Sequence, residues 1–162
     1  SSLSLSQVYL FNIFIVIKVM DSSFQHFLCF ITTDGNKQAF EIFEDRIASN
    51  LWPIYMRTNQ FRKVEKDIPV IFYLAGNGVS SQHFIGSAII NEIISPNKKL
   101  KVETSNIKFF VNFKNVKKFK KYVPIKNILN QLDFVINKEK YGLAFQGGIT
   151  EIDKKSYELI IK

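Results

Sequence analysis

The segment from Asn50 to Glu92 constrains the fold of this chain more than any other part of its sequence. Two apolar runs in it, Pro69–Ala75 and His83–Ile90, flank a short loop with the sequence Gly76–Gly78. This pattern predicts two neighbouring strands joined as a hairpin. The only tryptophan, Trp52, precedes them in a Trp-Pro sequence, which we interpret as an exposed aromatic loop. A small sheet beside such a loop suits the binding of a flat ligand better than the cleavage of bonds.

The remainder of the chain predicts further strands and a few helices. Strands are expected from apolar or alternating runs at Phe24–Thr32 and Ile107–Phe113. Helices are expected from apolar spacing or start signals at Gln38–Ser49, Ile125–Gln131 and Asp153–Ile161. Thr150 and Asp153 resemble a capping box before the last helix. Because strands outnumber helices and no β-α-β repeat is visible, the sequence predicts an α+β fold with a small twisted barrel.

Positive charge is concentrated in one segment. The 162-residue chain has a net charge of +8, and residues 98–126 hold ten lysines against one acidic residue, Glu103. Lysines neutralise phosphates without reading sequence, and the interleaved Phe119 and Tyr122 have rings that stack on bases. A solvated lysine-rich turn is the alternative. We expect contacts to a nucleic-acid backbone from Arg57, Arg62, Lys114, Lys117, Lys118, Lys120 and Lys121.

The composition argues against several classes of protein. A chain of this length with 46% hydrophobic residues can bury the core of one domain. Its single cysteine, Cys29, lies within a predicted strand and is expected to be a small buried hydrophobe, so we expect a reducing, cytoplasmic setting. With two histidines and one cysteine, neither a metal site nor a cofactor is expected. No phosphate-binding glycine loop or activated nucleophile is recognisable, and His83 is expected to be structural rather than a catalytic base.

The first nineteen residues are expected to lie outside the folded domain. The apolar run Val8–Ile17 is far shorter than the roughly 20 residues that span a bilayer. We therefore interpret residues 1–19 as an upstream extension that is not native or is disordered, and residues 20–162 as the domain. A membrane anchor, which is disfavoured, and an extra element packed on the barrel are the alternatives.

Several of these features follow one another along the chain in an order that is typical of one protein family. A tryptophan (Trp52) follows the first helix, a strand ends in tyrosine (Tyr73), and the next strand opens with Ile85-Gly86. The order resembles the EVE-domain family, a branch of the PUA-like and YTH-like pseudobarrels. The Gly-Asp turn that is common before the tyrosine strand reads Asp67-Ile68 here. The resemblance implies a PUA-like small mixed β-pseudobarrel with flanking helices.

The resemblance continues through the C-terminal block and covers the chain from Phe24 to Ile161. Its elements are, in order, a helix led by Pro124, the strand Leu132–Val135, the turn Lys138–Lys140, Tyr141 and a loop with Gly147-Gly148. Tryptophan is frequent in the family at the place of Tyr141.

The resemblance also implies a function, the reading of nucleic acid. It implies a pocket that accepts an extruded, modified base, for which methylated or hydroxymethylated cytosine in DNA is our first expectation. The expected pocket residues are Trp52, Tyr73, Tyr141, Thr32, Thr33 and Gln146. Each has a structural alternative, such as packing in the core. Restriction proteins or RNA-modification proteins are the partners that such a reader would have.

Three alternatives remain open from the sequence. The same fold and basic surface would serve an RNA reader of the YTH or PUA kind. Amidohydrolases of the related ASCH type work with Lys, Thr and Glu, and Thr32, Lys63 or Lys66, and Glu65 imitate that trio. A protein-interaction module would use the phenylalanine-rich strands as its contact surface.

Overall fold

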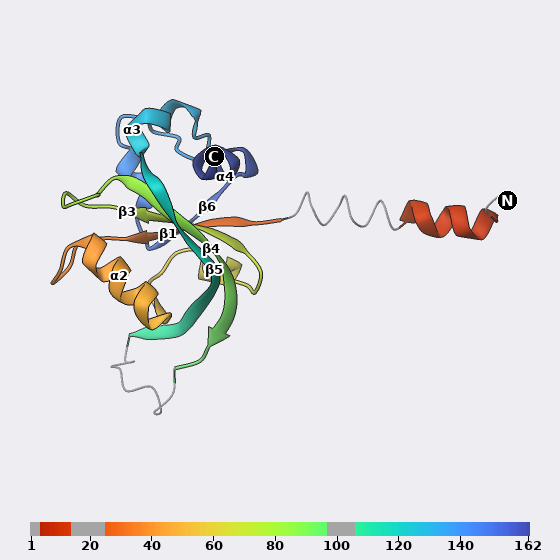
Figure 1. Ribbon diagram of the computed structural model, residues 1–162, viewed down its shortest axis with the longest axis horizontal. Coiled ribbons are helices and arrows are strands. Elements are labelled where there is room, and N and C mark those ends of the chain that lie inside the picture. The colour runs from red at the N-terminus through yellow and green to blue at the C-terminus, as the bar shows by residue number, and fades with distance from the viewer. Residues whose placement is uncertain (1–3, 14–24, 97–105) are drawn as a thin grey trace.

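The computed structural model describes residues 4–13, 25–96 and 106–162. A six-stranded mixed sheet curls into a half-barrel with the strand order β2-β5-β4-β3-β1-β6 (Figure 1). The strands are β1 (Phe27–Thr32), β2 (Trp52–Tyr55), β3 (Pro69–Leu74), β4 (His83–Ile94), β5 (Ile107–Pro124) and β6 (Ile149–Ile152). The helices after residue 24 are α2 (Ala39–Ser49), α3 (Ile125–Ile128) and α4 (Lys154–Ile161), with 3₁₀ turns at Phe61–Lys63, Leu129–Gln131 and Tyr141–Phe145. The predicted α+β, PUA-like pseudobarrel is confirmed.

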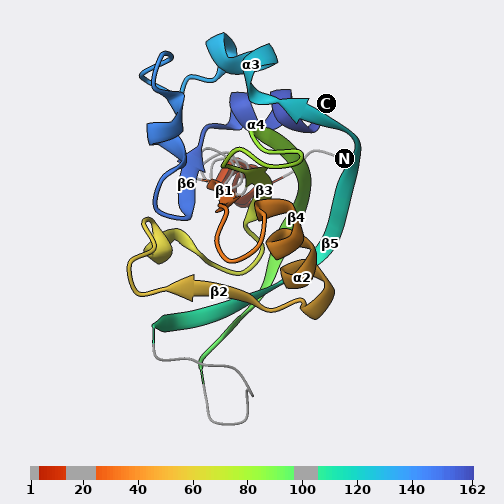
Figure 2. The same cartoon turned by 90° about the vertical axis from the view of Figure 1, so that its left-hand side faces the viewer.

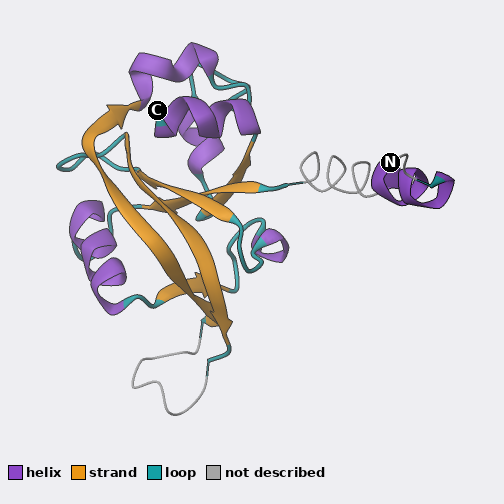
Figure 3. Ribbon diagram, turned by 45° about the vertical axis from the view of Figure 1, so that its right-hand side comes forward, coloured by secondary structure: helices purple, strands orange, loops and turns teal. Residues whose placement is uncertain are grey.

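The two longest strands, β4 and β5, cross the molecule from end to end (Figure 3). β1 and β3 are parallel, and the other neighbours in the sheet are antiparallel. The β4–β5 ladder is irregular between Phe84 and Gly86, where a Cβ atom on Gly86 would lie 2.6 Å from the Lys117 carbonyl oxygen. Such irregularities bend and twist a sheet, and this close approach requires glycine at the Ile-Gly position.

The core lies on both faces of the sheet, because side chains alternate along each strand. Leu28 and Phe30 of β1 face a cluster that α2 covers, whereas Cys29 and Ile31 face a second cluster beneath α3 and α4. Cys29 is fully buried, and burial raises the pKa of its thiol. It is the small buried hydrophobe that the sequence predicts.

Several predicted elements are confirmed with shifted ends. α2 begins one residue later than expected, β4 continues beyond Ile90, and β5 continues through the whole lysine run to Pro124. The expected hairpin is present as the antiparallel pair β3–β4, although its connection spans residues 75–82. Phe24, the expected start of the first strand, lies outside the described residues.

The prediction of an exposed Trp-Pro loop is wrong. Trp52 and Pro53 belong to β2, which pairs with β5 on one side only. Proline lacks the backbone N–H that a central strand needs, but an edge strand tolerates it. Trp52 is buried in the core cluster that α2 covers.

Two other local predictions are also wrong. Residues 132–135 form a turn rather than a strand, because Leu132 and Val135 are buried beneath the C-terminal part of the chain without joining the sheet. Thr150 belongs to β6 and does not cap α4; instead the Asp153 carboxylate accepts hydrogen bonds from the Ser156 amide and hydroxyl. The sequence pattern predicts no strand at β6.

The Asp67-Ile68 departure from the family turn has a simple explanation. Asp67 has φ = +69°, the left-handed conformation in which glycine is most common and which aspartate tolerates. Its amide donates to the Ile90 carbonyl at 2.8 Å, so the turn is kept without glycine.

Residues 5–13 are helical, and every described residue before position 14 is exposed. The assignment of residues 1–19 to an extension stays a prediction. In the described part of the chain, no helix has both the length and the apolar character needed to cross a membrane.

Candidate nucleic-acid site

The two edge strands of the half-barrel, β2 and β6, lie on the same side of the molecule (Figure 2). Residues of both strands line a small cavity. Its volume is about 200 Å³, below the range of roughly 300–1,000 Å³ that holds drug-sized ligands. We call it the seam cavity, and it is lined by Ile31, Thr33, Arg46, Trp52, Pro53, Ile54, Tyr55, Thr58, Gly147, Gly148 and Ile149. Its size suits a single flat ring.

Trp52 forms a rigid part of the cavity wall. Its side chain is only 2% exposed, and its ring stacks on Phe72 at 5.3 Å between centroids. Phe30, Phe43 and Phe113 meet it edge to face. Such pairs add stabilisation beyond the burial of their area.

The turn between α2 and β2 fixes where Trp52 enters the sheet. Asn50 ends α2 with φ = +49°, and its side chain both donates to and accepts from the backbone of Phe113. The side chain of Asn50 thus continues the β2–β5 ladder by one step and holds Trp52 against the core.

Arg46 supplies the positive charge of the seam cavity. Its guanidinium carbon lies 4.9 Å from the centre of the Trp52 ring, a cation–π arrangement. Burial lowers the pKa of the Arg46 guanidinium, and the neighbouring Tyr55 hydroxyl opposes that shift. Since an arginine side chain stays protonated in proteins, Arg46 offers charged N–H donors beside an aromatic wall.

The glycine pair 147–148 forms the opposite rim of the seam cavity. Both glycines have positive φ, +84° and +83°, and a Cβ atom on Gly147 would lie 2.2 Å from the amide nitrogen of the Asn59 side chain. The Gly147 carbonyl accepts from the Asn59 amide, and the Gly148 carbonyl accepts from the Ile31 amide, each at 2.9 Å. The first bond ties the segment after β2 to the loop before β6, and the second ties that loop to β1, so the cavity is preformed.

The structure distributes the six predicted pocket residues over several places. Thr33 and Trp52 line the seam cavity. Tyr73 and Tyr141 line a separate cavity of about 350 Å³, which we call the tyrosine pocket. Gln146 lines a groove of about 500 Å³ beside the seam. Thr32 is buried, and its hydroxyl has no hydrogen-bond partner within the described ranges. The six residues therefore do not line one cavity of the described structure, because Trp52 and Tyr73 pack on opposite faces of the sheet, and their roles in base binding stay predictions.

The tyrosine pocket has a different character. Tyr73 is 2% exposed and stacks on Phe145 at 4.0 Å between centroids, and burial raises the pKa of its hydroxyl. The Tyr141 hydroxyl donates to the side-chain oxygen of Gln82. The hydroxyl of Tyr141, which lines this pocket, thus already has a hydrogen-bond partner in the protein.

Sequence reasoning missed Arg46, Tyr55 and Thr58 as residues of the site. Arg46 lay among several charged residues of a predicted helix, and nothing in its spacing set it apart. The Gly147-Gly148 pair indicates a loop, and two adjacent glycines are the one signal in the sequence of a close backbone approach.

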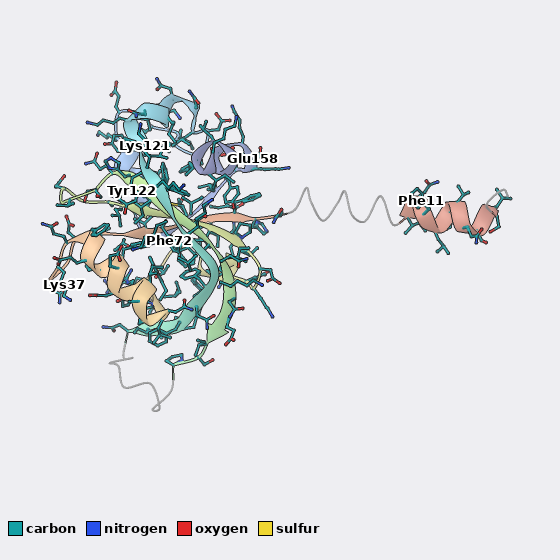
Figure 4. All side chains as sticks on the ribbon, in the orientation of Figure 1. Phe11, Lys37, Phe72, Lys121, Tyr122 and Glu158 are labelled. Carbon is teal, nitrogen blue, oxygen red and sulfur yellow. The ribbon has the colours of Figure 1, made fainter. Side chains whose placement is uncertain are left out.

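Within the described residues, the predicted backbone-binding side chains divide into those that form no ion pair and those that form one. Arg57, Arg62, Lys117, Lys120 and Lys121 are exposed. Lys114 makes an ion pair with Asp67 at 2.6 Å, and Lys118 makes one with Glu44 at 2.5 Å. The run is a strand rather than a turn, and Lys121 and Tyr122 lie near the end of β5 that leads to α3 (Figure 4). Lys98, Lys99, Lys101 and Glu103 lie outside the described residues.

The residues considered for catalysis have other surroundings. The Nδ1 atom of His83 lies 2.7 Å from the Ser81 carbonyl oxygen. Lys63 bonds to Glu151, and Glu65 and Lys66 are exposed while Thr32 is buried, so the imitated amidohydrolase trio is not assembled. In residues 4–13, 25–96 and 106–162, no three His, Cys, Asp or Glu side chains gather as metal ligands.

Comparison with solved structures supports the fold. The N-terminal domain of Staphylothermus marinus McrB matches 83% of this chain and 92% of its own length, with a TM-score of 0.54 and 11% identity. Protein Atu2648 from Agrobacterium tumefaciens matches 83% of this chain and 90% of its own length, with a TM-score of 0.54 and 10% identity. By sequence, no family model and no curated protein matches the chain. The resemblance to the EVE-like, PUA-like pseudobarrel is thus confirmed as a likeness of fold.

Proposed function

We propose that this protein reads nucleic acid by taking one extruded base into the seam cavity, and that its preferred target is a methylated or hydroxymethylated cytosine in DNA. The observation that carries the proposal is the cavity itself. It has room for one ring, a wall that includes Trp52, and the Arg46 guanidinium beside that wall.

The chemistry of the lining matches the needs of an extruded base. A flipped base is held by stacking and by hydrogen bonds to its pairing edge. Ile31, Ile54 and Ile149 supply apolar surface, while Arg46 and the Thr33 and Tyr55 hydroxyls supply hydrogen-bonding groups. The apolar residues of the lining would thus stack on the base, and the polar residues would bond to its pairing edge.

The exposed basic residues would contact the nucleic-acid backbone. Arg57 lies in the turn that follows β2, and Arg62 lines the groove that adjoins the seam. Lys117, Lys120 and Lys121 are exposed on β5 and would add affinity that falls with salt. We place this reader in the cytoplasm, as the single buried cysteine suggests, with restriction or RNA-modification proteins as its partners.

A binding screen at one salt concentration tests this proposal. The probes are duplex DNA and single-stranded RNA, each with cytosine, 5-methylcytosine or 5-hydroxymethylcytosine at the centre. We expect the wild-type protein to prefer a modified duplex. Tyr55→Ala should lower that preference, since an aromatic wall contributes roughly 1–3 kcal/mol per base. Tyr55 is 43% exposed, so the variant should fold.

Tyr9→Ala is the matched control, because Tyr9 is a 68% exposed tyrosine far along the chain from the cavity. It should bind like the wild type. A preference for RNA over all DNA probes would replace the DNA reading with an RNA one. Equal affinity for modified and unmodified probes of both kinds would contradict the proposed function.

A further inference from the structure

The turn that joins β2 to the following 3₁₀ segment projects an apolar side chain beside the seam cavity. Met56 is 58% exposed and stands between Tyr55 and Thr58, both of which line the cavity. Its neighbour Arg57 is also exposed. An exposed methionine next to an arginine at the rim of a candidate base pocket requires a reason beyond packing, because burial of Met56 does not hold the turn in place.

The backbone of this turn is held rigidly by hydrogen bonds. The Thr58 amide donates to the Tyr55 carbonyl at 3.0 Å, and the Tyr55 amide donates to the Thr58 hydroxyl at 3.0 Å. The Met56 amide donates to the Asn106 carbonyl at 3.0 Å. A turn fixed in this way presents its side chain without a large loss of backbone entropy on binding.

We propose that Met56 enters the base stack of a duplex at the place left by the base that moves into the seam cavity. Proteins that unstack a duplex insert apolar wedges, and methionine is among the side chains that they use. A methionine side chain is unbranched and polarizable, so it adapts to the faces of the neighbouring bases. Arg57 then lies where it can contact a phosphate beside the gap.

This inference rests on the proposed function, but it predicts a difference between duplex and single-stranded DNA that the proposed function does not. A wedge compensates for the energy of removing a base from a paired stack, and a single strand has little stacking and no pairing to replace. The contribution of Met56 should therefore depend on the form of the nucleic acid, whereas the contributions of the cavity residues should not.

The experiment measures the affinity of wild-type protein and Met56→Ala for four DNA probes. These are a duplex with a central 5-methylcytosine, the same duplex with cytosine, the modified single strand alone, and a modified duplex whose methylcytosine faces an abasic site. We expect Met56→Ala to weaken binding to the modified duplex about tenfold and to leave the single strand within about twofold. The abasic duplex should show an intermediate loss.

Val79→Ala is the matched control, because Val79 is a 65% exposed apolar residue in the β3–β4 turn, away from the cavity lining. It should bind all four probes normally, and both variants should melt like the wild type. An equal loss on duplex and single strand, or no loss on either, would overturn the wedge while leaving the base pocket in place. A wild-type protein that binds the first two duplexes equally would overturn the proposed function and the inference with it.

Discussion

The seam cavity and the tyrosine pocket are both lined by aromatic residues, yet they differ in what their polar groups do. In the seam cavity, Arg46 and Thr33 line the space between two sheet edges, and the Arg46 guanidinium interacts with the Tyr55 hydroxyl, which lines the same cavity. In the tyrosine pocket, the Tyr141 hydroxyl is bonded to Gln82 and Tyr73 is stacked on Phe145. A pocket whose polar groups are already paired inside the protein offers little to a ligand. Aromatic residues alone therefore do not identify the binding site.

The largest expected effect concerns the stability of the seam. Trp52→Ala should lower the free energy of unfolding by about 3–5 kcal/mol, because it removes a buried ring packed against four phenylalanines. Denaturation by urea, followed by circular dichroism, measures this loss. Trp52→Phe should retain much of the stability. A fully stable Trp52→Ala protein would mean that the seam wall does not depend on the core.

The next effect distinguishes the seam cavity from the tyrosine pocket by the affinity for a modified duplex. Arg46→Gln should reduce the affinity for the modified duplex about 10- to 100-fold, because hydrogen bonds to a charged group are worth roughly 1.5–3 kcal/mol. Arg46→Lys keeps the charge but loses the planar fork, and we expect it to rescue little of the loss. Titration with a labelled duplex gives both affinities.

In the tyrosine pocket, Tyr141→Phe should leave binding unchanged and lower stability by about 1 kcal/mol, since it removes one hydrogen bond. Measurements of duplex affinity and of unfolding in urea on the same variant test both expectations. A loss of base discrimination in Tyr141→Phe would transfer the site from the seam cavity to the tyrosine pocket.

The lysines on β5 should act on affinity without affecting the choice of base. Changing Lys117, Lys120 and Lys121 to Gln should weaken modified and unmodified duplexes alike and lower the salt slope by about 0.9 per lost phosphate contact. Lys114→Gln with Lys118→Gln should change the slope less, because these two lysines are already in ion pairs. An unchanged salt slope in the triple variant would assign the run to a solvated surface.

A pH effect on stability is expected at the turn beside the tyrosine pocket. Hydrogen bonds from the amides of Ala39 and Asn77 lower the pKa of Asp34 below its ordinary value. A lowered folded-state pKa means that Asp34 stabilises the fold above its ordinary pKa of about 4 and loses this contribution as the pH falls below it. Asp34→Asn should thus reduce the melting temperature at pH 7 and flatten its decline in acid. An unaltered acid profile would contradict the role of Asp34 in holding the turn at Asn77.

Much of the fold could be predicted because its local signals agree with its packing. The runs at 69–75 and 83–90 have strand composition and a turn between them, and Phe40, Phe43 and Ile47 mark one helix face. The edge strands β2 and β6 could not be predicted in the same way. Each has four residues, and β2 contains a proline, so their place in the sheet depends on pairing with distant partners rather than on local preference.

The candidate site could be predicted only in part for the same reason. Thr33 and Trp52 line the seam cavity, but Arg46 comes from a helix whose charged residues look alike in sequence. Alternation along the strands separates Tyr73 from Trp52, and a list of aromatic residues cannot show this before the strand register is known.

Trp52 allows the central claim, that one base enters the seam cavity, to be tested directly. It is the only tryptophan in the chain and it lines the cavity, so its fluorescence reports on that place alone. We expect a saturable change in Trp52 emission with a 5-methylcytosine or 5-hydroxymethylcytosine duplex, at the same concentration at which anisotropy of the labelled duplex shows binding. An unmodified duplex bound at low salt should leave the emission unchanged. Saturated binding of the modified duplex with no change in Trp52 emission would contradict the claim.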